Sequence, residues 1–140
     1  MIERLELLAE TCRRFQIEIL YAFGSRAREV KNWLEGVPVL AAGPSDVDIG
    51  AKPARGVVLE VYDKVRLALA LEDLLGVNRV DLVMLPEADP FLAANVIRGE
   101  RLYAADGYRA DEYDLYVLRR AGDLAPLERE RMALILGARS

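Results

Sequence analysis

In the first third of the chain, the spacing between apolar residues differs from one segment to the next. Residues 2–15 carry apolar side chains every three or four positions, which predicts an amphipathic helix. The apolar run over 17–23 is rich in β-formers and ends at Gly24, which predicts a strand. Residues 25–30 predict a short helix that begins at its serine, and 31–44 contain two glycines and two prolines, typical of a loop or hairpin.

The middle of the chain continues this alternation. Residues 47–51 predict a second strand, and 80–85 predict a third that Pro86 ends. Between them, residues 57–75 predict a long helix that Gly76 ends. The apolar face that we expect this helix to turn toward the core consists of Val58, Val61, Val65, Leu69 and Leu75.

The last third predicts mostly helices. Asp89 and Pro90 begin a helix that runs to about Arg98, with proline at a favoured first-turn position, and 101–104 predict a short last strand. Apolar residues recur every three or four positions over 105–140, where Gly122 and Pro126 predict a break between two helices. Together these elements predict an α+β domain with α/β character: a small mixed sheet flanked by helices over 1–104, followed by a helical extension over 105–140.

Two aspartates stand out against the apolar runs, because Asp46 and Asp48 are two positions apart at the start of a predicted strand. Side chains at i and i+2 of a strand point to the same face, so these carboxylates would repel each other. A divalent cation is the usual compensation. Asp81, in the next predicted strand, would complete a site for two Mg²⁺ ions that clamp a phosphoryl group.

Each aspartate also has a purely structural interpretation. Asp46 could cap a turn, Asp48 could be a solvated strand residue, and Asp81 could form a salt bridge with Arg79. The order of the segments favours the metal interpretation: a strand with Gly-Ser, an Asp-x-Asp pair on a strand, and a strand aspartate after a helix.

Gly24 and Ser25 lie between a predicted strand and a predicted helix. Free backbone N–H groups and the positive dipole end of a helix suit a phosphate group, and glycine allows its close approach. Arg26 and Arg28 follow and could offset the charge of a nucleotide. The alternative is that Ser25 is a simple helix N-cap.

Composition excludes several classes of function. The chain has 140 residues, 53% of them hydrophobic and 30% charged, which suits one domain with a core. Its formal net charge of −4 argues against broad nucleic-acid or membrane binding. It has no histidine, which excludes histidine-based catalysis and a histidine-ligated zinc site, and its single cysteine fits a reducing cytoplasm. The N-terminus is unlike a signal peptide, and no apolar run reaches the roughly 20 residues of a membrane helix.

Taken together, the motifs resemble the nucleotidyltransferase superfamily that includes DNA polymerase beta, and within it the minimal nucleotidyltransferases (MNT proteins). The resemblance covers roughly residues 5–104 and rests on four segments: Ala22–Glu29, Ser45–Ile49, Val80–Val83 and Ile97–Tyr103. It implies transfer of a nucleoside monophosphate, with AMP from ATP favoured, to a hydroxyl. Asp46, Asp48 and Asp81 would then be the catalytic and metal-binding residues, and Gly24 and Ser25 would hold the β/γ phosphates.

The resemblance also implies a partner and a place of action. MNT proteins commonly act in the cytoplasm as antitoxins of HEPN toxins and adenylylate a tyrosine of the toxin. An apolar C-terminal surface would suit either a partner or a homo-oligomer. The sequence differs from the family at Glu29, an acid near the phosphate site, and at about residues 30–44, which resemble an insertion beside the active site.

These two differences leave other functions open. One is an antitoxin that acts by contact alone, with a silent active site. A less favoured one is nucleotide transfer to a small molecule such as an aminoglycoside. Neither the nucleotide base nor the acceptor follows from the sequence.

Overall fold

The structure of the chain, a computed structural model, describes residues 2–38, 40 and 46–137. The elements follow the order α1 (Ile2–Arg14), β1 (Ile17–Phe23), α2 (Ala27–Leu34), β2 (Val47–Pro53), α3 (Val61–Leu75), β3 (Val80–Met84), a 3₁₀ turn η1 (Leu85–Glu87), α4 (Pro90–Ile97), β4 (Glu100–Ala104) and α5 (Gly107–Gly137). All four predicted strands are present, so the alternation of apolar segments located them correctly.

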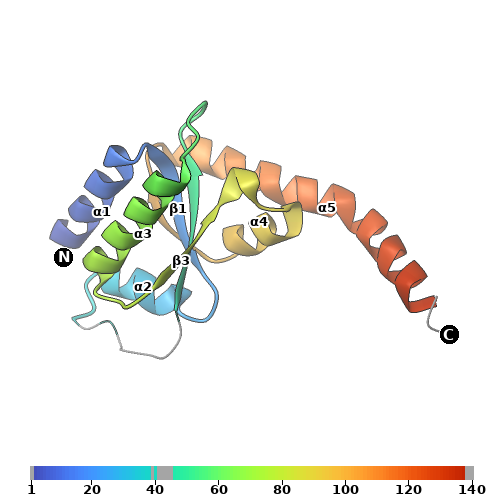
Figure 1. Cartoon of the computed structure of the whole chain (residues 1–140), viewed down its shortest axis with the longest axis horizontal. Coiled ribbons are helices and arrows are strands. Elements are labelled where there is room, and N and C mark those ends of the chain that lie inside the picture. Colours follow the sequence, from blue (N-terminus) through green and yellow to red (C-terminus); the bar gives the residue numbers. More distant parts are fainter. Residues whose placement is uncertain (1, 39, 41–45, 138–140) are drawn as a thin grey trace.

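The four strands form one mixed sheet in the order β3-β2-β1-β4. β1 pairs antiparallel with both β2 and β4, whereas β2 and β3 are parallel. The parallel pair is joined by the long helix α3, as a crossover between parallel strands requires. Helices cover both faces of the sheet (Figure 1). This mixed sheet flanked by helices confirms the α+β class with α/β character.

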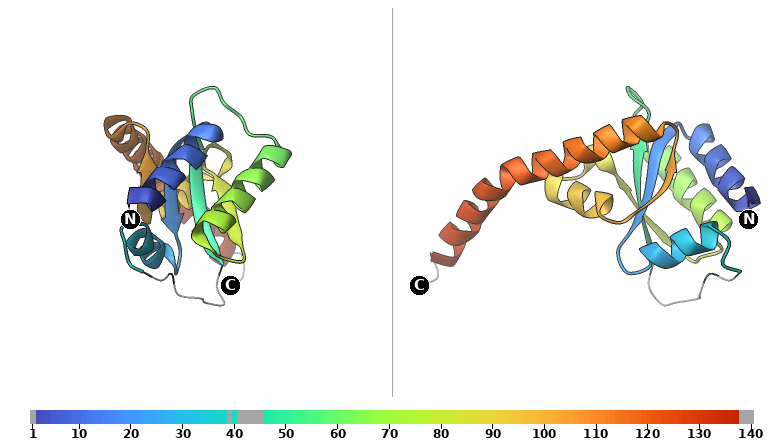
Figure 2. Two further views of the ribbon diagram at one scale, coloured as in Figure 1. Left: turned by 90° about the vertical axis from the view of Figure 1, so that its left-hand side faces the viewer. Right: turned by 180° about the vertical axis from the view of Figure 1, so that it is seen from behind.

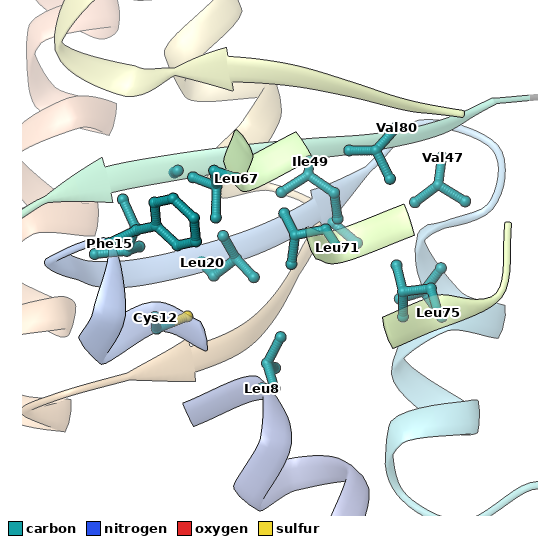
Figure 3. Packing of buried hydrophobic residues seen from close by; sticks show 14 of the residues in the cluster. Leu8, Cys12, Phe15, Leu20, Val47, Ile49, Leu67, Leu71, Leu75 and Val80 are labelled. Atoms are coloured by element: carbon teal, nitrogen blue, oxygen red, sulfur yellow. The ribbon is translucent and has the colours of Figure 1, made fainter. Parts of the chain in front are cut away.

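One face of the sheet forms the larger core with α1, α2 and α3. Leu8 and Cys12 of α1 point toward the sheet, and Leu67 and Leu71 of α3 lie against Ile49 (Figure 3). All five are at most 1% exposed. Burial raises the pKa of the Cys12 thiol to about 12, so this cysteine is a packing residue.

The other face of the sheet packs on α4 and α5. Ile19 and Tyr21 of β1 belong to this second core, whereas Ile17 and Leu20 belong to the first. The side chains of β1 change faces out of step with strict alternation because the pairing register shifts between Ile17 and Ile19, as it does at a β-bulge. In β2 the alternation is regular, so Asp48 points to the α4 and α5 side while Val47 and Ile49 are buried on the other side.

The predicted apolar face of α3 is wrong. Leu67, Leu71 and Leu75 are buried, while most of the expected face is exposed. The exposed residues of that face are Val58, Val61, Val65 and Leu69. The predicted start of this helix at residue 57 is also early, since the helix begins at Val61.

The segment after β1 also differs from the prediction. The helix begins at Ala27 rather than at Ser25, and its N-cap is Arg26, with no side-chain cap hydrogen bond. It continues to Leu34, because Val30 and Leu34 are both buried in the first core. The expected loop over 31–44 is therefore helical at its start. Residues 39 and 41–45, which include half of the rest, lie outside the described residues.

The C-terminal extension is one helix rather than two. α5 runs through Gly122 and Pro126 to Gly137, and its far half bends and leaves the body of the molecule (Figures 1 and 2). A proline removes one helix hydrogen bond and kinks the helix without having to end it. The division of the chain between residues 104 and 105 stays a prediction. None of the helices in the described part of the chain is long and apolar enough to cross a membrane.

Candidate functional site

Three strands bring the predicted site residues to one edge of the sheet. In the parallel pair, Asp48 of β2 lies opposite Asp81 of β3. In the antiparallel pair, Asp48 lies opposite Phe23, so the C-terminal end of β1 meets the N-terminal end of β2. Gly24 directly follows Phe23. The topology therefore gathers segments that are far apart in the sequence, as the metal interpretation requires.

Gly24 lies next to the Asp48 carboxylate. Its φ of +77° lies in the left-handed region, which glycine adopts at little cost. A Cβ added at this position would lie 2.5 Å from Asp48 Oδ2. A side chain at this position would therefore have to push the carboxylate aside, and the positive φ also favours glycine.

Asp48 is in an unfavourable environment for its negative charge. Partial burial raises the pKa of its carboxyl group, and the nearby carboxylates of Asp81 and Asp46 raise it further. The three carboxylates are thus close enough to repel one another. A bound cation would relieve this repulsion, and it would also favour the ionised form of Asp48.

Arg79 supplies one positive charge to this cluster. Its Nε lies 3.1 Å from Asp81 Oδ1 and 3.7 Å from Asp46 Oδ2. The backbone holds it there, because the Val47 N–H donates to the Arg79 carbonyl at 3.2 Å. The pairing of Asp81 with Arg79 that the sequence allowed is confirmed, and Asp46 shares the same guanidinium.

The donor set of this site fits Mg²⁺, which prefers carboxylate oxygens. The side chains are not arranged as a metal site. Within residues 2–38, 40 and 46–137, no group of three acidic or cysteine side chains is placed to hold a metal ion. Two of the three carboxylates are turned to Arg79 instead. Assignment of Asp46, Asp48 and Asp81 as metal ligands therefore stays a prediction.

The predicted phosphate-binding residues separate into two groups. Gly24 and Ser25 are exposed at the start of the turn that leads to α2. Arg28 is also exposed, with its Nη2 3.7 Å from Glu100 Oε1. These three are accessible to a ligand, and their roles stay predictions.

Arg26, by contrast, is buried, and its Nε lies 2.5 Å from Glu29 Oε1. The positive charge of Arg26 thus compensates Glu29, the acid near the phosphate site at which the chain differs from the family pattern. The role of Arg26 in binding a nucleotide stays a prediction.

Sequence reasoning missed the contact between Arg79 and Asp46. The two residues are 33 positions apart, and only the parallel register of β2 and β3 brings them together. A partial signal existed, because Arg79 stands two positions before Asp81. Such spacing indicates that Arg79 shares the local environment of the site, but not which second acid it contacts.

Comparison with known families identifies this architecture. The family model described as Polymerase beta, Nucleotidyltransferase matches residues 6–108, which include every predicted site residue. None of the curated proteins matches the chain.

Solved structures resemble both the core and the full length of the chain. A toxin–antitoxin structure with AMP-PNP contains a chain 21% identical, covering 97% of this chain and 98% of that chain, with a TM-score of 0.68. A tri-AMPylated HEPN toxin from Shewanella oneidensis in complex with an MNT antitoxin gives 23% identity, 98% and 97% coverage, and a TM-score of 0.63. A provisionally assigned minimal nucleotidyltransferase is 34% identical over 71% of this chain and 87% of its own, with a TM-score of 0.50. The first two identities support the fold alone.

Proposed function

Because the chain belongs to the polymerase beta nucleotidyltransferase family, we propose that it moves a nucleoside monophosphate from a nucleoside triphosphate to a hydroxyl of a partner protein. The observation that carries the proposal is the position of Asp48, which lies beside Gly24 on one side and opposite Asp81 on the other, with Asp46 near enough to perturb it. This chemistry depends on positioning and charge neutralisation, and it needs neither histidine nor cysteine.

Each residue of the site would have a distinct task. Asp46, Asp48 and Asp81 would hold Mg²⁺, which when bound neutralises the triphosphate and favours loss of the proton from the attacking hydroxyl. Gly24 would let the phosphates approach the backbone, and the Ser25 hydroxyl would donate to a phosphate oxygen. Arg28 would add positive charge at the rim of the site.

We further propose that the acceptor is a HEPN-type toxin and that this chain is its antitoxin. Support comes from the toxin–antitoxin structures that share its fold over nearly its full length, one of which contains AMP-PNP and another an AMPylated HEPN toxin. AMP is therefore the favoured group. A tyrosine hydroxyl is the acceptor that the resemblance to MNT proteins implies. Both proteins would meet in the cytoplasm.

A surface suited to such a partner lies on α5, outside the part of the chain that matches the family model. Val117 and Ala121 are buried against the body, but beyond them the helix exposes apolar side chains. We define the α5 stripe as Leu124, which is half-buried, and Leu127, Leu134 and Ile135, which are exposed. A helix with an uncovered apolar stripe is suited to a helical partner.

Label transfer tests the enzymatic proposal. The chain is purified with the product of its neighbouring gene and given Mg²⁺ with α-labelled ATP, CTP, GTP or UTP in turn. The expected result is label on the partner with ATP and none with Asp46→Asn. A stable complex that takes up no label with any nucleotide would contradict the proposal.

The second candidate is an antitoxin that acts by contact alone. It is favoured by one observation: Asp46 and Asp81 contact Arg79 rather than forming a ready metal site. Cells that carry the toxin with the double variant Asp46→Asn, Asp48→Asn separate the two. Growth protected by this variant would support contact alone, whereas loss of protection, with the complex still formed, supports catalysis.

A further inference from the structure

Arg79 has a place in the candidate site that no family property assigns to it. Its guanidinium lies between two of the three acids, with Nε 3.1 Å from Asp81 Oδ1 and 3.7 Å from Asp46 Oδ2. The carboxylate lone pairs that accept from an arginine are the same ones that a metal ion needs. The two cations also repel each other at such distances. Arg79 and a metal ion therefore compete for the same oxygens.

The ion pairs of Arg79 are weak enough for its guanidinium to be displaced. The Arg79 side chain is 68% exposed and its two acidic partners are 42% and 43% exposed. Ion pairs this exposed are weak, so a divalent ion held by several carboxylates can displace the guanidinium. The backbone bond from Val47 keeps the arginine beside the site after its side chain has moved.

Asp48, the third acid of the site, is not paired with Arg79. Asp48 forms no ion pair with any lysine or arginine in the described part of the chain, and it is the acid nearest to Gly24. Arg79 thus offsets part of the negative charge of the two outer carboxylates, and the inner one has no such ion pair within the described part of the chain. This arrangement limits the repulsion among the acids and leaves Asp48 as the first ligand available to an entering ion.

We infer that Arg79 is a positioning residue: it is the counter-cation of the metal-free site, and it lowers the affinity of the site for a divalent ion until that ion displaces it. The inference rests on the proposed function, because it takes the three aspartates as the metal ligands. It adds that entry of the metal and departure of the Arg79 side chain are one coupled event.

Manganese binding to the nucleotide-free protein tests this inference without any activity assay. Mn²⁺ is titrated by calorimetry into the wild type, Arg79→Gln, Arg79→Lys and Arg66→Gln. Arg66 is the matched control, because it is an exposed arginine paired with Asp63 on α3, away from the site. Arg79→Gln is expected to bind Mn²⁺ about fivefold more tightly than the wild type. Arg79→Lys, which keeps the charge, and Arg66→Gln should stay within about twofold.

Unchanged or weaker binding by Arg79→Gln would overturn the inference. Adding Asp48→Asn to the wild type and to Arg79→Gln separates this failure from that of the proposed function. If Asp48→Asn abolishes Mn²⁺ binding and Arg79→Gln does not alter it, only the role of Arg79 fails. If Mn²⁺ binding survives Asp48→Asn, or if neither the wild type nor Arg79→Gln binds the ion, the aspartates are not the metal site and both fail.

Discussion

At the scale of single residues, Asp48 is a predicted functional residue that lowers the stability of the folded protein. Its carboxyl group is partly buried, contacts the Gly24 turn closely and faces two other acids. Folding therefore brings its negative charge into a less favourable environment than water, which opposes folding at neutral pH. Active sites commonly retain such unfavourable charges because function requires them.

Asp48→Asn is expected to stabilise the metal-free protein and to abolish nucleotide transfer. Removing the charge relieves repulsion of up to about 1 kcal/mol, which corresponds to a rise in Tm of about 2–4 °C. Differential scanning calorimetry at pH 7 without divalent ions measures this rise, with Asp63→Asn as the control for loss of an exposed acid. A lower Tm in Asp48→Asn would show that its charge is compensated in the folded protein.

Gly24 offers a second test at the same scale, because Gly76 has a similar backbone conformation but different surroundings. Gly24 and Gly76 have φ of +77° and +68°. A Cβ at Gly24 would meet Asp48, whereas a Cβ at Gly76 meets nothing within 4 Å. Comparing the two alanine variants separates backbone strain from the collision.

Gly76→Ala is expected to cost about 1 kcal/mol in the free energy of unfolding, from backbone strain alone. Gly24→Ala should cost at least about 1 kcal/mol more, and it should weaken Mn²⁺ binding because it displaces the Asp48 carboxylate. Urea denaturation and Mn²⁺ titration measure these effects. Equal losses of stability and unchanged metal binding would mean that Asp48 moves aside freely.

At the scale of elements, the two longest helices each expose an apolar face. The exposed face of α3 and the buried one are both spaced three or four residues apart, so helical period alone could not distinguish them. Leu67, Leu71 and Leu75 are buried because α3 packs on α1 and the sheet along that side. Strand positions were easier to predict, because only a short β-rich run fits a buried strand.

The continuity of α5 also lay beyond sequence reasoning. Gly122 and Pro126 weaken a helix, and an isolated segment containing both would be expected to break there. Packing of Val117 and Ala121 on the body anchors the first half of the helix, and the second half continues from this anchor. Tertiary contacts therefore support the helix up to Ala121, next to Gly122, and Pro126 lies within the helix without ending it.

The exposed faces of α5 and α3 make a matched pair for locating the partner. The double variant Leu127→Asp, Leu134→Asp places two charges on the α5 stripe, and Val61→Asp, Val65→Asp places two on α3. All four side chains are exposed, so both variants should fold. Burying charges in an interface should weaken partner binding at least about tenfold for α5, and leave it unchanged for α3.

Calorimetric titration of the purified partner into each variant measures this difference. Retention of binding by the α5 variant and its loss in the α3 variant would assign the interface to α3 instead. Loss in both would require a partner that contacts opposite sides of the molecule, since α3 and α5 cover different faces of the sheet (Figure 1).

At the scale of the whole molecule, the site exists because of the sheet order. β1 lies next to β2, and β2 next to β3, so the Gly-Ser turn and the aspartates meet at one edge. The residue types and their order along the chain were enough to predict this meeting. The detailed state of the site was not predictable: the sharing of Arg79 by Asp46 and Asp81, and the pairing of Arg26 with Glu29, depend on side-chain geometry across elements.

The central claim is that these aspartates modify a partner protein, and the mass of that partner tests it most directly. The partner is purified from cells that co-express it with the wild type or with the variant Asp46→Asn, Asp48→Asn, and its intact mass is measured. The account predicts that the wild type raises the mass by one or more AMP groups, and that the variant, although still bound, leaves it unchanged. An unmodified partner in a stable complex with the wild type would contradict the account.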